Sequence, residues 1–345
     1  MTRVGLVGYG SSGRTFHAPL VAAAGLELVA VATGNPERVA QVGADSPSAL
    51  VVPDLAGLLE VADLDLVVLA SPTGVHAAQV AQVVASGPAV VVDKPLAVDA
   101  SAALEAVDVA AHEGVPLTVF QNRRYDPEFR TMQRVLASGE LGQVLRAELR
   151  WERWRPVPKD RWRENAAPGE GGGILLDLFS HLVDQAVLMF GPVGTVYAEL
   201  AAHTTTAEDT AFLSCRHGSG VVSHLGATSV SAAPGPRVRL LGDRAAYLIG
   251  AQRDEETAFT EWQPADADHI GWLVRGSERE PVRGEPGDQA DFYREVAEAL
   301  RQDDPQAAMP VDPHDAVHVL AVLDAARVSA TGGRVVEVIT PGDAP

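Results

Sequence analysis

The 345-residue sequence has one cysteine and no long hydrophobic run, and each absence excludes a class of protein. Because Cys215 stands alone, the chain can form neither an internal disulfide framework nor a metal site of several thiolates. Its place in the strand-like run 211–215 predicts a buried, inert thiol. The longest apolar runs, such as residues 66–70 and 89–92, have the length of strands, so no membrane partner is expected.

Positive charge is also scarce, since 27 Lys and Arg stand against 46 Asp and Glu and the net charge is −19. Nucleic acids bind to basic faces, so no nucleic-acid partner is expected. An anionic ligand must instead be bound by a local structural feature, because the overall field of the protein is negative. The sequence enters a strand-like segment at residues 3–7 without a charged leader or cleavage site, which favours the cytoplasm.

The first 120 residues alternate apolar runs with helical stretches. Strands are predicted at residues 3–7, 27–32, 66–70, 89–92 and 117–120, and helices near residues 14–24, 54–60, 75–86 and 101–113. Strands rich in Val and Leu with little polar alternation are covered on both faces, which indicates a parallel sheet. Residues 1–121 are therefore predicted to form a Rossmann-type, doubly wound α/β domain.

Beyond residue 121 strands follow one another. They are predicted at residues 144–152, 195–201, 211–215, 221–227, 238–241, 246–249 and 334–338, with helices at 127–138, 288–301 and 312–328. The polar stretch 253–287, rich in Gly, Pro and acids, is predicted to be loops. Successive strands favour an antiparallel sheet with one face packed on helices. Residues 122–345 are therefore expected to form an α+β domain with a large, open, mostly antiparallel sheet.

A glycine-rich loop follows the first strand directly. Gly8, Gly10 and Gly13 form the pattern GxGxxG between a strand and a helix, the context that dinucleotide binding requires. The glycines permit a tight turn, close approach of a pyrophosphate and close packing of the helix on the strand. The helix N-terminus offers free N–H groups to phosphates, and Ser11 and Ser12 are expected to take part. The loop predicts a nicotinamide dinucleotide.

The end of the second strand bears on the choice between NAD and NADP. Thr33 lies 20 residues after Gly13, where an NAD enzyme usually carries an acidic residue for the ribose hydroxyls. A missing carboxylate removes repulsion against a 2′-phosphate, and Arg38, with Asn35 nearby, can pair with that phosphate. This favours NADP, with NAD as the other option. The alternative is that Arg38 lies on a solvated helix face.

The turn after the 66–70 strand is expected at the carboxyl edge of the sheet, where ligands bind in open α/β folds. It contains Ser71, Pro72 and Thr73 and leads to His76. Ser71, Pro72 and Thr73 are candidate cofactor contacts. His76 either contacts the cofactor or caps its helix, and the sequence leaves both open.

Lys94 ends the next strand, within the turn Asp93-Lys94-Pro95, at the same edge of the sheet. The chain has only one other lysine, Lys159, and uses arginine at its other basic positions. A desolvated lysine can lose its proton, whereas arginine cannot. Lys94 is therefore a candidate for proton transfer, with Asp93 beside the cofactor.

A second candidate cluster lies on an apolar helix after the glycine run 171–173. Asp177 and His181 are four residues apart, so they share a face of the helix, and Asp184 follows three residues later. Polar groups on such a helix are costly unless they meet a cavity or a partner. A histidine oriented by a carboxylate can accept the proton of an alcohol. The pattern also fits a polar stripe facing water, and no third ligand at metal spacing is present.

Taken together, these motifs resemble the glucose–fructose oxidoreductase/inositol dehydrogenase (Gfo/Idh/MocA) family over the whole chain. The signals are the loop 8–13, the Asp93-Lys94-Pro95 turn that matches the family's Glu-Lys-Pro, and the Asp177 and His181 pair. The runs 119–126, 155–156 and 161–164 are similar to the branch that contains NADP-dependent scyllo-inositol dehydrogenases.

The resemblance implies a Rossmann domain and a C-terminal α/β domain whose open sheet makes dimer or tetramer contacts. It implies hydride exchange between nicotinamide C4 and a carbinol carbon of a sugar or cyclitol. By position, Lys94 would hold the substrate hydroxyl and assist proton transfer, and His181 would be the general acid/base. Asp177 would orient His181 or bind a neighbouring hydroxyl.

Four further residues are assigned by position alone: Asn122 and Trp162 beside the nicotinamide, and Tyr125 and Arg155 in the substrate pocket. The sequence departs from the family pattern at two positions. Asp93 replaces the usual Glu, which shortens a contact on the cofactor side. Thr73 stands where the family often has Asn, which leaves the contacts of that loop open.

The leading prediction is thus an NADP-preferring dehydrogenase of polyols or sugars that forms a homodimer or homotetramer through its C-terminal sheet. Alternatives are reduction of an aldose or another carbonyl, a redox-assisted glycosidase that retains its cofactor, or a sugar-responsive regulator that binds NAD(P) without turnover. Lys94, Asp177 and His181 together favour an enzyme, because a sensor needs the cofactor loop but not the groups for proton transfer.

Overall fold

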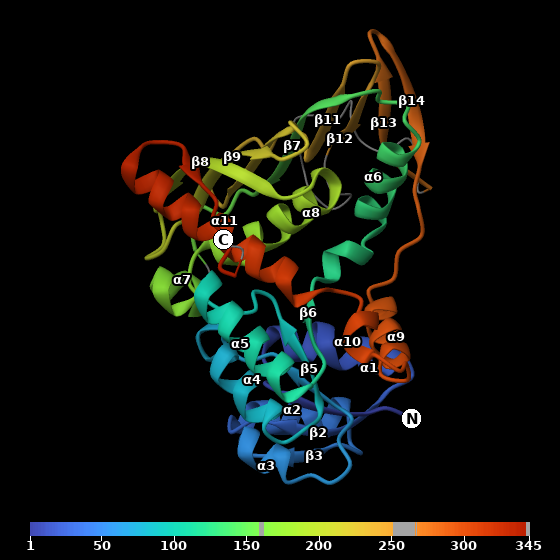
Figure 1. Cartoon of the computed structure of the whole chain (residues 1–345), viewed down its shortest axis with the longest axis vertical. Helices are drawn as coiled ribbons and strands as arrows, with labels where there is room; N and C mark the ends of the chain where they lie inside the picture. The colour runs from blue at the N-terminus through green and yellow to red at the C-terminus, as the bar shows by residue number, and fades with distance from the viewer. Residues whose placement is uncertain (159–161, 251–265, 267, 343–345) are drawn as a thin grey trace. The chain divides into compact units, whose positions relative to one another are not determined.

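A computed structural model describes residues 1–158, 162–250, 266 and 268–342 (Figure 1). The chain forms two compact units, Met1–Asn122 with Asp288–Val317, and Arg123–Gly287 with His318–Pro345. The sequence analysis assigned residues 288–317 to the second domain, whereas their contacts group them with the first unit. The reason is packing that the sequence pattern does not show: the rings of Phe292 and Tyr293 lie 5.0 and 5.7 Å from that of Phe120.

The first unit contains a six-stranded parallel sheet in the order β3-β2-β1-β4-β5-β6, as the Rossmann prediction requires. The strands are β1 (Arg3–Val7), β2 (Glu27–Ala32), β3 (Leu50–Val52), β4 (Leu66–Leu69), β5 (Ala89–Asp93) and β6 (Leu117–Phe120). Every residue of β4 and β5 is buried, because helices cover both faces. The order reverses between β1 and β4, and ligands bind at the carboxyl ends of strands at such a point.

The helices of this unit are η1 (Gly13–His17), α1 (Ala18–Ala23), α2 (Pro36–Asp45), α3 (Leu55–Leu59), η2 (Thr73–Val75), α4 (His76–Val84), α5 (Ala100–Glu113), α9 (Ala290–Ala299) and α10 (Pro305–Ala308). The side chains of Asn35, Asp54 and Asp99 each accept an N–H in the first turn of α2, α3 and α5, which explains where these helices begin. The sequence analysis missed α2, in which Val42 alone is buried, and β3, which is only three residues long.

The second unit contains a nine-stranded sheet in the order β14-β13-β12-β11-β7-β10-β9-β8-β15. Its strands are β7 (Val144–Glu152), β8 (Val193–Ala201), β9 (Thr210–His217), β10 (Val222–Thr228), β11 (Val238–Gly242), β12 (Ala246–Ile249), β13 (His269–Arg275), β14 (Glu278–Arg283) and β15 (Val336–Glu337). Only the pair β7 and β10 is parallel among the described pairings. The prediction of a large, mostly antiparallel sheet is confirmed.

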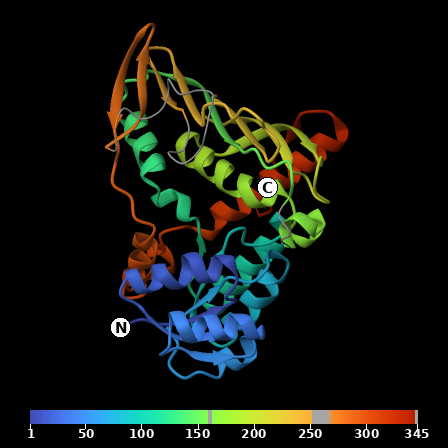
Figure 2. The same ribbon diagram turned by 180° about the vertical axis from the view of Figure 1, so that it is seen from behind.

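The strands β13 and β14 correct one prediction, since residues 253–287 were expected to be loops. They form an antiparallel hairpin at the edge of the sheet, seen from behind in Figure 2. The edge strand β14 is mostly exposed, so its sequence lacks the apolar alternation on which the prediction relied. The part 253–265 lies outside the described residues.

Helices cover one face of this sheet. They are η3 (Asn122–Tyr125), α6 (Pro127–Ala137), α7 (Trp162–Asn165), η4 (Pro168–Glu170), η5 (Leu175–Phe179), α8 (Ser180–Phe190) and α11 (Pro313–Gly332). The helix α8 packs on β10 and against α6, and Ser329 of α11 accepts the backbone N–H of Ala198 in β8 at 2.9 Å. In β7, Ala147, Leu149 and Trp151 are buried on the helix side. No helix within the described residues is long and apolar enough to span a membrane.

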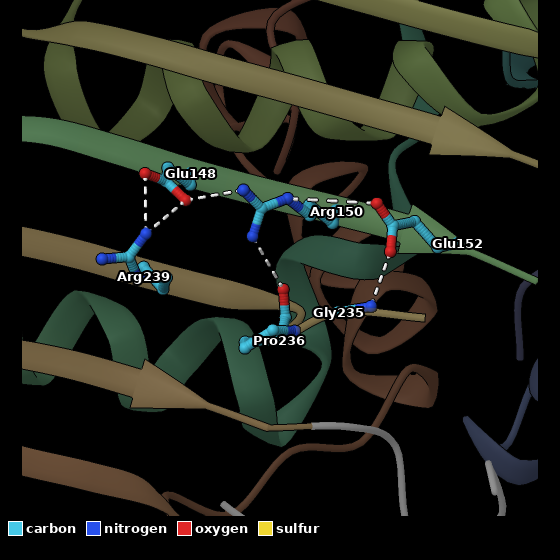
Figure 3. Close-up of polar contacts among 6 residues, drawn as sticks. All are labelled: Glu148, Arg150, Glu152, Gly235, Pro236 and Arg239. Carbon is cyan, nitrogen blue, oxygen red and sulfur yellow. Dashed lines mark hydrogen bonds and ion pairs between the residues drawn. The ribbon is translucent and has the colours of Figure 1, made fainter. Parts of the chain in front are cut away.

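The other face of β7 carries charged side chains in a linked network (Figure 3). The carboxylate of Glu148 accepts hydrogen bonds from Arg150 at 2.8 Å and from Arg239 of β11 at 2.9 Å. Glu152 accepts the backbone N–H of Gly235 at 2.6 Å and lies 4.0 Å from Arg150. Opposite charges that face each other across neighbouring strands stabilise their pairing, so this face is polar around β7 and β11.

Candidate active site

The loop after β1 can exist only with glycine at two positions. Gly8 has a φ of +91°, and a Cβ atom there would lie 2.6 Å from the carbonyl oxygen of Ala70. A Cβ atom on Gly13 would lie 2.1 Å from the carbonyl oxygen of Gly8. Both distances are shorter than any van der Waals contact, so the loop packs tightly on the turn after β4. The result is a backbone cradle at the carboxyl edge of the sheet.

The cradle continues into η1 and then α1. The Arg14 N–H donates to the Gly10 carbonyl at 2.9 Å, and the Thr15 hydroxyl donates to the Ser11 carbonyl. The first N–H groups of a helix have no partner within it, which suits them to phosphate oxygens. Ser12, a predicted cofactor residue, lies close enough to Asp93 at the end of β5 to lower the pKa of that carboxyl.

Arg38 of α2 lies against the glycine loop. Its guanidinium Nη2 is 3.7 Å from the position that a Cβ of Gly10 would occupy. The guanidinium group has no hydrogen-bond or ion-pair partner among the described residues. Asn35 caps α2 by accepting the Arg38 N–H at 3.1 Å, and Thr33 is buried with its hydroxyl 3.5 Å from the Asn35 N–H. The cap fixes the start of α2 and thereby the place of Arg38.

His76 connects two turns at the same edge. Its Nε2 lies 2.9 Å from the Ser71 carbonyl and its Nδ1 lies 2.9 Å from the Pro95 carbonyl. The Ser71 hydroxyl donates to Gln79 at 2.5 Å. Burial lowers the pKa of His76, opposed by the Asp93 carboxylate and the two carbonyls. Both ring nitrogens of His76 face backbone carbonyls, so the side chain links two turns of the protein. The sequence had left open whether His76 contacts the cofactor or caps its helix.

Four other predicted cofactor residues occupy different settings. Pro72 precedes η2 and Thr73 begins it with a buried side chain. The Asn122 amide donates to Gln289 at 3.0 Å and is also buried. Trp162 begins α7, but its side chain lies outside the described residues.

The Lys94 turn follows β5 and includes a cis peptide bond between Lys94 and Pro95. Lys94 is half-buried, and its backbone N–H donates to the carboxylate of Asp93 at 2.9 Å. The other carboxylate oxygen of Asp93 lies 3.7 Å from His17 Nε2. Burial alone would raise the pKa of Asp93, but the nearby polar groups of His17, Lys94 and Ser12 hold it well below its usual range. Asp93 is therefore a buried, charged group.

His17 and Tyr293 were not anticipated from the sequence. His17 is fully buried at the end of η1, with Nδ1 2.5 Å from the hydroxyl of Tyr293 in α9. Its ring lies 4.4 Å from that of Phe120. The two polar residues are 276 positions apart in the chain. No local signal could have paired them.

The second unit has its own pocket, which contains two of the predicted substrate residues, Asp177 and Arg155. Its lining is dominated by charged and hydroxyl side chains: Arg153, Arg155, Pro158, Glu164, Gly173, Ile174, Asp177, Leu178, Thr204, Thr205, Glu208, Asp209 and Ser229. Asp177 lies in the π-helical turn η5 and is half-buried. The sequence analysis missed the other charged groups, which come from separate loops and strand ends.

The carboxylates on the floor of the pocket are held by backbone N–H groups. Glu208 accepts the Leu175 N–H at 3.3 Å, and a Cβ on Gly173 would lie 2.3 Å from its carboxylate. Asp209 accepts the backbone N–H groups of His203 and Thr204 at 3.0 and 2.7 Å. Burial alone would raise the pKa of Asp209, but these bonds and the Thr204 hydroxyl lower it. The floor is therefore rigid and negatively charged.

His181 and Asp184 lie one and two turns beyond Asp177. His181 is buried in the first turn of α8, with its ring 6.2 Å from that of Trp151, and it is not among the described residues that line the pocket. Asp184 is buried and receives two hydrogen bonds from Arg124, at 3.0 and 2.5 Å. The polar stripe on this helix therefore meets protein partners, as its apolar surroundings require.

Tyr125, the remaining predicted substrate residue, is buried at the end of η3. The Arg130 guanidinium lies 5.4 Å from the centre of its ring. A Cβ on Gly287 would lie 2.3 Å from its carbonyl oxygen, so the chain passes very close to this residue. Among the described residues, no group of three His, Cys, Asp or Glu side chains is arranged to hold a metal ion.

In comparisons with known proteins, each of the two parts of the chain matches a family model. Residues 2–121 match the oxidoreductase family with an NAD-binding Rossmann fold, and residues 129–248 match the GFO/IDH/MocA C-terminal domain. The uncharacterized oxidoreductase YdgJ of Escherichia coli is 33% identical over 95% of this chain and 96% of its own length.

A curated protein and a solved structure, both from Bacillus subtilis, extend the likeness. The scyllo-inositol 2-dehydrogenase (NADP(+)) IolW is 29% identical over 97% of this chain and 95% of its own length. The solved structure of the oxidoreductase YvaA superposes with a TM-score of 0.85, at 28% identity, over 98% of this chain and 99% of that chain. The chain therefore belongs to the Gfo/Idh/MocA family of NAD(P)-binding oxidoreductases.

Proposed function

We propose that the protein is an NADP-preferring dehydrogenase that oxidises a secondary alcohol of a cyclitol or sugar, or reduces the corresponding ketone. The observation that carries the proposal is the polar pocket around Asp177 and Arg155. Each hydroxyl of a polyol both donates and accepts hydrogen bonds. A pocket that combines carboxylates, guanidinium groups and the hydroxyls of Thr204, Thr205 and Ser229 matches that chemistry.

The similarity to IolW supports both the substrate class and the cofactor. That relative is named for scyllo-inositol and NADP, and the likeness extends over 97% of this chain. A cyclitol is an uncharged ring of hydroxyls, which suits a pocket whose four carboxylates, Glu164, Asp177, Glu208 and Asp209, outnumber its two arginines. An anionic substrate would be repelled by the same groups.

The preference for NADP rests on Arg38. Its guanidinium lies beside Gly10, at the loop expected to hold the pyrophosphate, and has no partner among the described residues. Thr33 brings no negative charge to the end of β2. A 2′-phosphate can therefore pair with Arg38 without competing with a carboxylate.

In the proposed reaction, the glycine loop, Lys94 and His181 have separate roles. Gly8, Gly10 and Gly13 would hold the dinucleotide, which supplies the hydride acceptor or donor when bound. Lys94 would bind the reacting hydroxyl through its ammonium group. His181 would accept the hydroxyl proton during oxidation and return it during reduction, with the rest of α8 and Trp151 restricting its ring.

Asp177 has a binding role in this proposal. Its side chain lines the pocket, where it can accept a hydrogen bond from a hydroxyl next to the reacting carbon. Arg155 can donate to the oxygens of further hydroxyls. These contacts would fix which carbinol is presented for oxidation, and positioning of this kind contributes much of an enzyme's rate.

We further propose that two copies of the chain associate through the open face of the nine-stranded sheet. The face of the sheet that carries the Glu148 network also carries half-buried aromatic side chains at Tyr197, Phe212 and Trp272. A homodimer or a homotetramer would cover them. Light scattering after size exclusion tests this, and Phe212→Glu should shift the mass toward the monomer.

The test of the function is formation of the reduced dinucleotide, followed by absorbance, with NADP and NAD against a panel of inositols, aldoses and alditols. Turnover with NADP and an inositol is the expected result. Activity confined to aldoses would move the substrate class to reduction of open-chain carbonyls. Binding of dinucleotide without turnover of any compound would contradict the proposal and favour a regulator.

A further inference from the structure

A chain of buried side chains in the first unit runs from α9 to the Lys94 turn. It starts at Tyr293, whose hydroxyl lies 2.5 Å from His17 Nδ1. His17 Nε2 faces the carboxylate of Asp93 at 3.7 Å, and Asp93 accepts the backbone N–H of Lys94 at 2.9 Å. The function proposed above uses Lys94 but assigns no task to His17 or Tyr293.

The arrangement fixes which nitrogen of His17 carries a proton toward Asp93. Burial and the Asp93 carboxylate raise the pKa of Tyr293 well above its usual value, so the phenol keeps its proton. A phenol that donates to Nδ1 leaves the ring proton on Nε2, the atom that faces Asp93. The ring cannot turn away, because it is fully buried and packs on Phe120.

Asp93 is approached by polar groups from each element around it. The Lys94 backbone N–H bonds to it, His17 of η1 lies 3.7 Å from it, and Ser12, Tyr293 and His76 lie within its electrostatic reach. Its carboxylate is 8% exposed and the His17 ring is not exposed at all. The buried charge therefore depends on these groups to remain charged.

Stability alone is a weak reason for such a pair. Even a fully ionised buried pair contributes little to folding beyond what an apolar pair of the same volume would contribute. What an apolar pair could not provide is a fixed negative charge in the residue directly before Lys94. That charge lies on the carboxylate that accepts the Lys94 backbone N–H, and a nearby negative charge favours the protonated form of an amine.

We propose that His17, supported by Tyr293, is a positioning residue that holds Asp93 as a charged anchor for the Lys94 turn. This inference rests on the proposed role of Lys94 in proton transfer.

Three variants separate the contacts. His17→Phe keeps an aromatic ring on Phe120 but removes both polar contacts. His17→Gln restores an N–H toward Asp93, and Tyr293→Phe removes only the hydroxyl. A matched control is His217→Gln in the second unit, where a buried histidine also makes two contacts, to the Gly191 carbonyl at 2.6 Å and the Ser223 hydroxyl at 2.8 Å.

The first readout does not depend on turnover. The chain has only two lysines, so reductive methylation with ¹³C-formaldehyde gives an NMR spectrum with two lysine signals and that of the α-amino group. Lys159→Arg assigns the signal of Lys94. In His17→Phe the Asp93 carboxyl loses its partner, and burial then favours its protonated form. The titration midpoint of Lys94 should fall, while that of Lys159 stays unchanged.

The second readout is kinetic. In His17→Phe, kcat should fall about 10- to 100-fold, as when the partner of a catalytic group is removed, with the dinucleotide Kd near its wild-type value. The effect should be smaller in Tyr293→Phe, and His17→Gln should recover much of the rate. The pH profile of kcat should shift with the Lys94 midpoint. His217→Gln should change neither.

Two results would overturn the inference. One is a folded His17→Phe, or a folded His17→Gln if the first does not fold, in which the Lys94 signal and midpoint match the wild type. The other is a parallel loss of kcat and dinucleotide affinity, which would make His17 a part of the loop alone. The Lys94 midpoint can shift in His17→Phe even if the wild-type protein oxidises no polyol. That result would support the positioning role and contradict the proposed function.

Discussion

Asp93 in the first unit and Asp177 in the second are both near proposed chemistry, yet their surroundings are opposite. Asp93 is 6% exposed and its oxygens are taken by groups of the protein. Asp177 is half-buried and lines a pocket. A carboxylate surrounded by protein donors can hold other residues in place, whereas one that faces a pocket can bind a ligand. The comparison assigns scaffolding to the first and recognition to the second.

The same contrast extends to the two sites as a whole. The dinucleotide cradle consists of backbone at positions where no side chain fits, as at Gly8 and Gly13. The pocket of the second unit consists of charged side chains from several loops. A backbone cradle suits one constant cofactor, while a pocket of side chains can change its specificity by substitution. Function in this chain is therefore shared between a rigid part and an adjustable part.

The largest expected effect is that of Lys94→Ala. Loss of a group that assists proton transfer should lower kcat by about 10²- to 10⁴-fold, with the dinucleotide Kd unchanged. Steady-state kinetics and fluorescence titration of the reduced dinucleotide measure the two quantities. A loss of only a few-fold would remove Lys94 from the mechanism.

The rigid part is tested by Gly13→Ala. The added Cβ would lie 2.1 Å from the Gly8 carbonyl oxygen, so the loop must move. Backbone strain of about 1–3 kcal/mol would weaken dinucleotide binding by about 5- to 150-fold. Gly43→Ala is the matched control, since Gly43 is exposed in α2 with nothing near its Cβ position, and there alanine should stabilise the helix by about 1 kcal/mol. Equal affinity in both variants would contradict the cradle.

The choice of cofactor is tested by Arg38→Ala. A charged hydrogen bond contributes about 1.5–3 kcal/mol, so the Kd for NADP should rise about 10- to 100-fold while that for NAD stays the same. Isothermal titration with both cofactors measures this. If both affinities fell together, Arg38 would support the loop rather than the 2′-phosphate.

The adjustable part is tested at Arg155. Arg155→Ala should raise the KM for the polyol about 2- to 10-fold, the contribution of one hydrogen bond, and leave the dinucleotide Kd as it was. Lysine should restore little, because it lacks the planar fork of donors. Arg146→Ala, at an exposed position of β7, is the control. An unchanged KM in Arg155→Ala would place the substrate elsewhere.

The scaffolding role of Asp93 predicts a dependence of stability on pH. Its folded-state pKa lies below the unfolded value of about 3.9, so its contribution is complete above that value and is lost as the pH falls below it. The difference in unfolding free energy between the wild type and Asp93→Asn should therefore be largest near pH 7 and shrink toward pH 3. Urea titrations at both values test this, and a constant difference would argue against a compensated carboxylate.

The sequence predicted the features that depend on neighbours along the chain. The loop 8–13 and the succession of strands indicated both sheets, because periodicity and glycine spacing are local. It could not reveal the pair His17 and Tyr293, which only the packing of α9 on β6 brings together. It also missed the edge strand β14, since an exposed edge needs no apolar pattern. The pocket was half foreseen, through Asp177 and Arg155, because Glu208 and Asp209 join it from a separate strand end.

The most direct test of the central claim is to follow deuterium from the substrate. A polyol that the protein oxidises, deuterated at its carbinol carbons, is incubated with NADP, and the reduced dinucleotide is analysed by mass spectrometry. The account predicts NADPH that is heavier by one deuterium. NADPH without deuterium, or no reduced dinucleotide from any polyol, would contradict hydride transfer from a carbinol carbon.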